Sequence, residues 1–254
     1  MKSGRFDALS VTGFLIAFAA LAGGNMLEGG QLGALIQGTA FLVVVGGTVG
    51  AVMLQTPPSI FKRAMEMLTW VVRSPRFDHD EHIDKVLEWA EIARKDGPLA
   101  LERLASREGD LFTRKGMMLL ADGHKALEIR QILEVEISAK EYKEMQAAKV
   151  FEGMGGYSPT IGIIGAVMGL IHVMNNLTEP AKLGDGIATA FVATVYGVAF
   201  ANLVFLPVAN KLKGTIESRV LEQAMVLEGI VGIAEGANIR VLENKLRSFF
   251  NEAG

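Results

Sequence analysis

Residues 153–178 read GMGGYSPTIGIIGAVMGLIHVMNNLT, and this stretch contains no Asp, Glu, Lys or Arg. It is bounded by Glu152 and Glu179. A helix needs about 20 mostly apolar residues to cross the hydrocarbon core of a bilayer. The stretch is long enough, so it predicts a membrane-spanning helix near residues 157–177.

Three other charge-free stretches are also long enough to span a bilayer, at residues 8–27, 29–61 and 186–210. The second is longer than one span, and Pro57-Pro58 predicts where its helix ends. Half of the residues are hydrophobic and the mean hydropathy is +0.32, which is high for a soluble domain. We therefore expect four spans, near residues 8–27, 33–55, 157–177 and 187–209.

The first stretch has a competing interpretation as a cleaved signal peptide. Lys2 and Arg5 precede it, and Ala20-Leu21-Ala22 resembles a cleavage site. The apolar run, however, has the length of a complete span, which favours a retained helix.

The basic residues predict the orientation of the spans. Lys2 and Arg5 precede the first span, and Lys182 is the only basic residue in the two short turns between spans. Residues 62–152 hold sixteen basic side chains, and the tail from Lys211 onward holds six. Because cytoplasmic segments are enriched in Lys and Arg, we expect a multi-pass inner-membrane protein with both termini in the cytoplasm.

The charged segments show helical rather than strand periodicity. Ile83, Val86, Leu87, Ala90 and Ala93 recur at three- and four-residue spacing. Gly97-Pro98 should end that helix. A later polar stretch leads directly into the third span, with an apolar stripe at Ile129, Ile132, Leu133, Ile137 and Met145, and two amphipathic runs follow at 216–233 and 241–250.

These patterns predict an all-α fold, a polytopic membrane protein with a helical cytoplasmic domain. Its expected parts are residues 1–56 with the first two spans, 57–152 as the cytoplasmic helical domain, 153–210 with the last two spans, and 211–254 as a cytoplasmic tail.

The spans lack any residue that is charged at neutral pH, and His172 is their only candidate for proton transfer. A lone histidine is more often a packed residue than a relay. Transporters of protons or cations usually carry an ionisable group within the membrane. If this chain conducts ions, the carboxylate must therefore come from another chain.

Several classes of function find no support in the sequence. Cysteine is absent, which excludes disulfides and thiolate-ligated metals. We find no nucleotide-binding loop and no catalytic triad pattern, and the net charge of −3 does not indicate nucleic-acid binding. We expect neither an enzyme nor a bound cofactor.

Small residues and prolines mark the last two spans. Glycine and alanine at 162, 165, 166 and 169, and at 190, 193, 197 and 201, predict close helix packing. Pro159 should lie in the first turn of its span, where it costs little. Pro207 removes a helical hydrogen bond and should kink the fourth span near its cytoplasmic end.

Three segments together resemble the MotA flagellar stator family, in the superfamily shared with the ExbB and TolQ energisers. Residues 157–170 read YSPTIGIIGAVMGL, residues 194–197 read TVYG with PVANKL following at 207–212, and residues 93–102 read ARKDGPLALE. The resemblance covers nearly the whole chain. The alternative is an energiser subunit of the ExbB or TolQ kind that drives envelope transport. Such relatives usually have three spans, whereas four are expected here, which favours the stator.

The resemblance implies a membrane-embedded pentamer around a dimer of a single-span B-type subunit that carries the ion-binding aspartate. The channel and gating residues would be Pro159, Thr160, Ala166, Thr194, Tyr196 and Pro207. Sodium-driven relatives have threonine where this chain has Ala166, so the resemblance favours protons, with sodium as the alternative. Ser158 departs from the alanine that often precedes the proline, with little expected consequence.

The resemblance also implies a contact with the rotor's switch-complex protein. In the family this contact uses an arginine and a glutamate eight residues apart, and Arg94 and Glu102 match, with Lys95 beside the arginine. Eight residues correspond to about two helical turns, but Gly97-Pro98 lies between Arg94 and Glu102. The spacing therefore does not require the two side chains to lie on one helix face.

Overall fold

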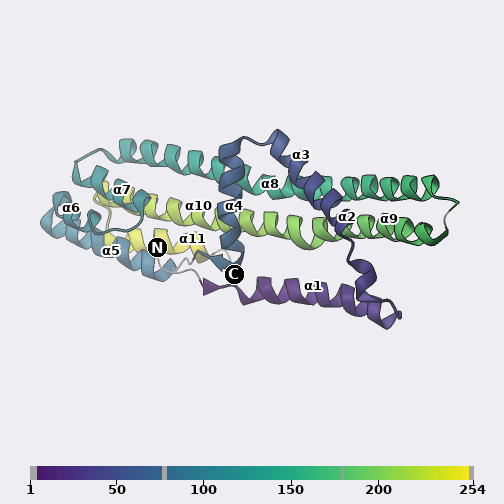
Figure 1. The fold of residues 1–254 in the computed structure, drawn as a ribbon. Coiled ribbons are helices and arrows are strands. Elements are labelled where there is room, and N and C mark those ends of the chain that lie inside the picture. The colour runs from purple at the N-terminus through teal and green to yellow at the C-terminus, as the bar shows by residue number, and fades with distance from the viewer. Residues whose placement is uncertain (1–4, 76–78, 179, 252–254) are drawn as a thin grey trace. The chain divides into compact units, whose positions relative to one another are not determined.

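The computed structural model describes residues 5–75, 79–178 and 180–251 (Figure 1). The described chain is helical apart from one antiparallel pair of two-residue strands, β1 (Arg5–Phe6) and β2 (Arg73–Ser74). It divides into two compact units. We call residues 5–74 and 144–213 the span unit, and residues 75–143 and 214–251 the head unit.

Four helical stretches in the described residues are long and apolar enough to cross a membrane, which confirms the predicted number. The first is α1 (Ala8–Leu27). The second, Leu32–Gln55, is built from the short helix η1 (Leu32–Leu35), α2 (Gly38–Phe41), the π-helical turn η2 (Leu42–Gly46) and α3 (Gly47–Gln55). Its helix ends before Pro57-Pro58, as predicted, and α4 (Pro58–Val72) begins there.

The third stretch lies in α8 (Ala126–Asn175), a single helix of 50 residues. The predicted continuity between the polar stretch and the third span is confirmed. The prediction that Pro159 occupies a first helical turn is wrong, because the proline lies inside α8. Proline has no backbone N–H, so Pro159 cannot donate a hydrogen bond to the Gly155 carbonyl. The third span of the chain therefore lacks one helical hydrogen bond.

The fourth stretch begins in α9 (Pro180–Phe200) and continues through the π-helical turn η4 (Ala201–Phe205) into α10 (Leu206–Ala234). Pro207 is the second residue of α10. A π turn is a wider helical turn, and prolines and π turns are both recognised causes of local helix distortion. The kink predicted at Pro207 stays a prediction, and the π turn ends two residues before this proline.

The head unit contains α5 (His79–Asp96), η3 (Pro98–Leu101), α6 (Glu102–Ala105), α7 (Leu111–Ala121) and α11 (Ile239–Asn251). The start of α8 and the end of α10 complete it. Helix α5 ends at Asp96, directly before Gly97-Pro98, as predicted. Gly97 has a φ of 84°, a conformation that favours glycine.

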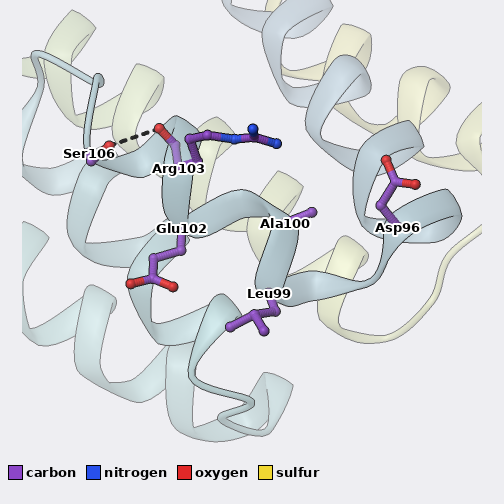
Figure 2. Close-up of a pocket in the computed structure, with 6 residues that line it drawn as sticks. All are labelled: Asp96, Leu99, Ala100, Glu102, Arg103 and Ser106. Atoms are coloured by element: carbon purple, nitrogen blue, oxygen red, sulfur yellow. Dashed lines mark hydrogen bonds between the residues drawn. The ribbon is translucent and has the colours of Figure 1, made fainter.

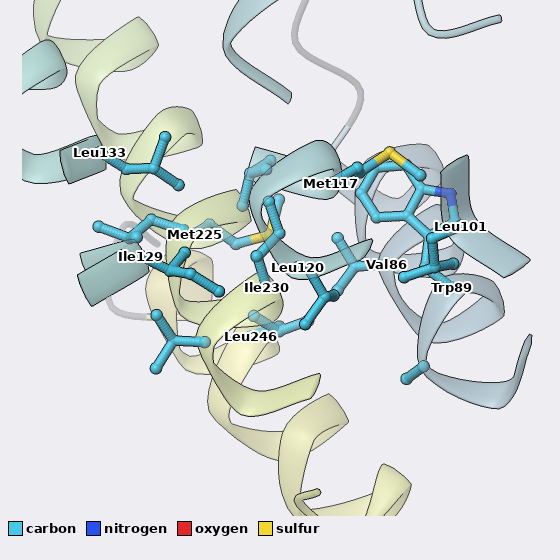
Figure 3. Close-up of a cluster of buried hydrophobic side chains, with 14 of the residues drawn as sticks. Val86, Trp89, Leu101, Met117, Leu120, Ile129, Leu133, Met225, Ile230 and Leu246 are labelled. Carbon is cyan, nitrogen blue, oxygen red and sulfur yellow. The ribbon is translucent and has the colours of Figure 1, made fainter. Parts of the chain in front are cut away.

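The core of the head unit is one apolar cluster (Figure 3). Ile83, Val86 and Ala90 are buried in it, which confirms the periodicity read in α5. Gly116 of α7 lies so close to α10 that an added methyl group would be 2.5 Å from Ile230 Cδ1. Ile132 is an exception to the predicted α8 stripe, since it is exposed while Leu133 beside it is fully buried.

An ion cluster joins three helices of the head unit. Arg130 of α8 donates to both carboxylate oxygens of Glu228 on α10 through its two terminal nitrogens, Nη1 and Nη2. The distance from Nη2 to Oε2 is 2.9 Å. Lys245 of α11 donates to the same carboxylate. The hydrogen bond from Arg130 is the main cause that lowers the pKa of Glu228 from 4.5 to about 2.

The lowered pKa predicts an acid-sensitive head unit. Glu228 stabilises the folded chain fully above its unfolded pKa of 4.5, and this contribution disappears as the pH falls toward 2. Glu228→Gln should therefore lower the melting temperature at pH 7 and flatten its decline between pH 5 and 3. Circular-dichroism melting of the purified full chain measures both effects. Glu235→Gln, at an exposed glutamate of the same unit, is the control and should melt like wild type. An unchanged pH dependence in Glu228→Gln would contradict this assignment.

Candidate channel and rotor-contact sites

The channel candidates lie on two helices whose backbones approach very closely. A methyl group on Gly162 of α8 would lie 2.9 Å from the Ala193 carbonyl oxygen and 3.0 Å from the Gly197 Cα of α9. A methyl group on Gly197 would lie 2.7 Å from the Ser158 carbonyl oxygen. Real Cβ atoms do not approach so closely, so only glycine fits both positions. The small residues read from the sequence therefore pack within the chain, as predicted.

The same contact continues along the two helices. A methyl group on Gly165 would lie 2.9 Å from Ala193 Cβ, and one on Gly169 would lie 2.9 Å from Ala190 Cβ. At the other end, one on Gly155 would lie 2.6 Å from Leu206. Residue numbers rise on α8 as they fall along α9 and α10, so the two helices are antiparallel and their register is fixed.

This register places the two prolines at different levels. Pro207 follows Leu206, which lies against Gly155, whereas Pro159 is four residues further along α8. Four residues correspond to about 6 Å along a helix. Pro159 and Pro207 therefore lie about one helical turn apart along the α8–α9/α10 contact. Pro159 is half-buried and Pro207 is exposed.

Two of the candidate hydroxyls, Thr160 and Thr194, lie on exposed surfaces of their helices. Thr160 donates to the Tyr157 carbonyl at 2.8 Å, and Thr194 donates to the Ala190 carbonyl at 3.3 Å. Each hydroxyl thus bonds to its own helix and keeps an oxygen lone pair available. Ala166 is half-buried on α8, and His172 is exposed further along.

Tyr196 has a different environment. Its hydroxyl donates to the Leu35 carbonyl at 2.6 Å and accepts from the Gln37 amide at 3.3 Å. Its ring lies edge-on to Phe41 and Phe200, with centroids 6.3 and 5.8 Å away. Tyr196 therefore fixes the entry into α2 in this chain. No periodicity in the sequence indicated this contact, because its partners are backbone groups 159 and 161 residues away.

Ser158, the residue that departs from the family pattern, is fully buried. Its hydroxyl has no hydrogen-bond partner within the described residues, and the same holds for buried Thr48 of α3. An unpaired buried hydroxyl costs free energy relative to alanine. The departure thus has a local cost that the sequence comparison did not suggest.

The rotor-contact candidates all lie on the surface of the head unit. Arg94 and Lys95 are exposed in the last turn of α5, and Glu102 is exposed as the first residue of α6. Glu102 lines a shallow depression of about 500 Å³ (Figure 2), together with Asp96, Leu99, Ala100, Arg103 and Ser106. Arg94 lines a second depression together with Ala90, Ala93, Pro98, Ile233, Gly236, Ala237 and Asn238. The structure therefore places the matched charges on neighbouring elements but beside different depressions.

Comparisons with known proteins identify the family of this chain. A model of the MotA/TolQ/ExbB proton channel family matches residues 105–225, and a model of the motility protein A N-terminal region matches residues 11–96. The chain is 34% identical to motility protein A of Bacillus subtilis, over 94% of this chain and 89% of that protein. It is 35% identical to motility protein A of Helicobacter pylori, over 96% and 95%. The chain belongs to the motility protein A family.

Solved structures extend the likeness to three dimensions. The chain is similar to a chain of C. jejuni MotAB with a TM-score of 0.92 and 35% identity, covering 98% of this chain and 97% of that one. It is also similar to a chain of the Bacillus subtilis flagellar MotAB stator complex, with a TM-score of 0.86 and 33% identity. As a family member, this chain is a multi-pass membrane protein and a flagellar stator subunit of the proton channel family rather than an enzyme.

The close contact between α8 and α9 generates a test. Gly197→Ala forces a methyl group against the Ser158 carbonyl oxygen and should destabilise the folded chain by about 1–3 kcal/mol, typical of overpacking. Thermal unfolding of the purified protein in detergent should show a lower melting temperature. Gly184→Ala, in the same helix with no atom within 4 Å of the added methyl group, should melt at or above the wild-type temperature. Equal melting of the two variants would show that this close contact does not contribute to stability.

Proposed function

We propose that this chain forms a pentamer around a dimer of a single-span B-type subunit and couples proton flow to torque on the rotor. The observation that carries the proposal is the absence of any Asp, Glu, Lys or Arg from the four predicted spans. A cation path across the membrane needs an ionisable group or a set of oxygen ligands. A carboxylate supplied by another chain would meet this need.

The exposed hydroxyls support a path between this chain and that partner. Thr160 and Thr194 each present an oxygen on a helix surface that no other part of the described chain covers. The related MotAB structures contain a B-type subunit, which supports an assembly of this kind here. In the orientation that the basic residues favour, both termini and the head unit face the cytoplasm, in the inner membrane.

Ion choice depends on the ligands that the path offers. Sodium needs several oxygen ligands, whereas a proton needs only one titratable group. Thr194 offers a hydroxyl oxygen, whereas Ala166 has no side-chain oxygen. We therefore favour protons over sodium for this chain.

Rotation of tethered cells tests the proposal. A flagellated strain that lacks all stators is complemented with this gene and its neighbouring single-span partner gene. We expect rotation that continues without sodium and stops when a protonophore is added. Rotation lost without sodium would contradict the inferred ion. If both proteins reach the membrane and no rotation follows, the energiser alternative gains support.

The proposed rotor contact has its own test. Exposed charge pairs form weak, rapidly exchanging contacts, which suits a surface that acts repeatedly on a moving rotor. Arg94→Glu combined with Glu102→Lys should leave assembly intact and greatly reduce rotation speed. Lys125→Glu combined with Asp122→Lys makes the same charge exchange at another exposed site of the head unit and should rotate normally. Normal rotation in the Arg94–Glu102 variant would exclude the contact.

A further inference from the structure

Two hydroxyls of the span unit are fully buried and have no hydrogen-bond partner within the described residues. They belong to Thr48 of α3 and Ser158 of α8, and both residues are 0% exposed. A buried hydroxyl that makes no hydrogen bond keeps the full cost of its removal from water. Buried polar groups without a protein partner are commonly satisfied by ordered water. The relative position of the two hydroxyls decides whether one water can reach both.

The second span and α8 are antiparallel neighbours with a fixed register. A methyl group on Gly47 of α3 would lie 3.0 Å from Ile161 Cγ2, and one on Gly153 of α8 would lie 3.6 Å from Val52 Cγ2. Residue numbers on the two helices therefore run in opposite directions. Thr48 directly follows Gly47, so the two buried hydroxyls lie within about one helical turn of the same level.

Both hydroxyls also lie on the buried faces of their helices. Val44, Thr48 and Val52 recur at four-residue spacing, and all three are fully buried. On α8, Gly165 follows Ser158 by seven residues and shares its helix face. A methyl group on Gly165 would touch both the second span and α9. The two hydroxyls are therefore enclosed where the second span, α8 and α9 meet.

Pro159 leaves a third polar group unpaired at this level. Because proline has no N–H, the carbonyl of buried Gly155 lacks its usual helical donor. Gly155 precedes Ser158 by three residues, a spacing that puts both on one side of α8. In membrane helices, ordered waters help to satisfy the carbonyls that a proline leaves unpaired.

We propose that Thr48, Ser158 and the Gly155 carbonyl bind one ordered water molecule inside the span unit. A buried water typically makes about three hydrogen bonds, which matches these three groups. The carbonyl can only accept, so the water donates to Gly155, and each hydroxyl can donate to the water or accept from it. A hard cation takes six or more oxygen ligands, so three groups fit water better than an ion.

The proposed water joins α3 to α8 at the point where α8 lacks a helical hydrogen bond. It supplies the partner that the Ser158 hydroxyl does not find within the described residues. Since Ser158 stands where the resembled family often has alanine, the serine gives this chain a polar link that an alanine could not make.

A double-substitution cycle tests the bridge. Ser158→Ala and Thr48→Val each remove one hydroxyl with little change of volume. The full chain is melted in detergent as wild type, as each single variant and as the double variant. We expect each single variant to melt at a lower temperature than wild type, because the substitution leaves the bridging water with one bond fewer. The double variant should melt above the temperature that the sum of the two single shifts gives, because the two hydroxyls share one water.

Matched controls correct for the substitutions themselves. Ser218→Ala in α10 and Thr12→Val in α1 make the same changes at exposed positions and report the effect of helix propensity alone. Thr48→Ser keeps the hydroxyl and should retain the coupling to Ser158→Ala. Single variants that both melt higher than their controls would show that the hydroxyls are unpaired and would overturn the proposal. Additive losses would give the hydroxyls separate partners and would overturn it as well.

Electron cryo-microscopy identifies the bridging species, in the assembly that the full chain forms in nanodiscs. At a resolution that shows ordered water, we expect a density peak within hydrogen-bond distance of both hydroxyl oxygens. The peak should be absent from the variant that combines Ser158→Ala with Thr48→Val. Direct contact between the two oxygens without a peak would show a side-chain hydrogen bond and exclude the water. Neither readout depends on ion flow or rotation, so failure here is distinguishable from failure of the proposed function.

Discussion

The close approach of α8 to α9 is the constraint on which the span unit depends. Two glycines, Gly162 and Gly197, meet at distances that leave no room for a methyl group on either backbone. Membrane helices gain little from hydrophobic burial against one another, so backbone proximity and van der Waals packing provide most of the stabilisation. Fixing this contact also fixes the register of both helices. The positions of Thr160, Ala166, Thr194 and both prolines relative to one another follow from that register.

Much of this arrangement could be predicted from the sequence because it depends on local composition. Charge-free length predicted the spans, and Gly97-Pro98 and Pro57-Pro58 marked real helix ends. The site residues were harder to interpret. Pro159 lies inside a helix because α8 continues through it, and no local signal distinguishes a tolerated proline from an initiating one. Tyr196 bonds to backbone atoms far away in sequence, which no residue pattern records.

The composition of the spans determines which part of ion transfer this chain can perform. The spans contain hydroxyls and small residues but no carboxylate, so the chain can shape a path without supplying its titrating group. A surface of this kind can respond to a change of charge on a partner because residues 153–178 and 186–210 contain no Asp, Glu, Lys or Arg that would compete. In the proposed assembly, the group that binds the ion belongs to the partner, whereas this chain carries the rotor-contact candidates.

Helix α4 connects the end of the second span to the start of the first span. Where a span ends, the backbone N–H and C=O groups of the following residues need hydrogen-bond partners. Here α4 follows the second span, and the carbonyl of Val72, its last residue, accepts a hydrogen bond from the Asp7 amide at the start of the first span. The loop formed by the first two spans and α4 is thereby closed by hydrogen bonds at the start of α1. Core packing contributes little there, because none of the residues of α1 is buried within the chain. Surrounding lipid or neighbouring subunits must then supply the remaining contacts of α1.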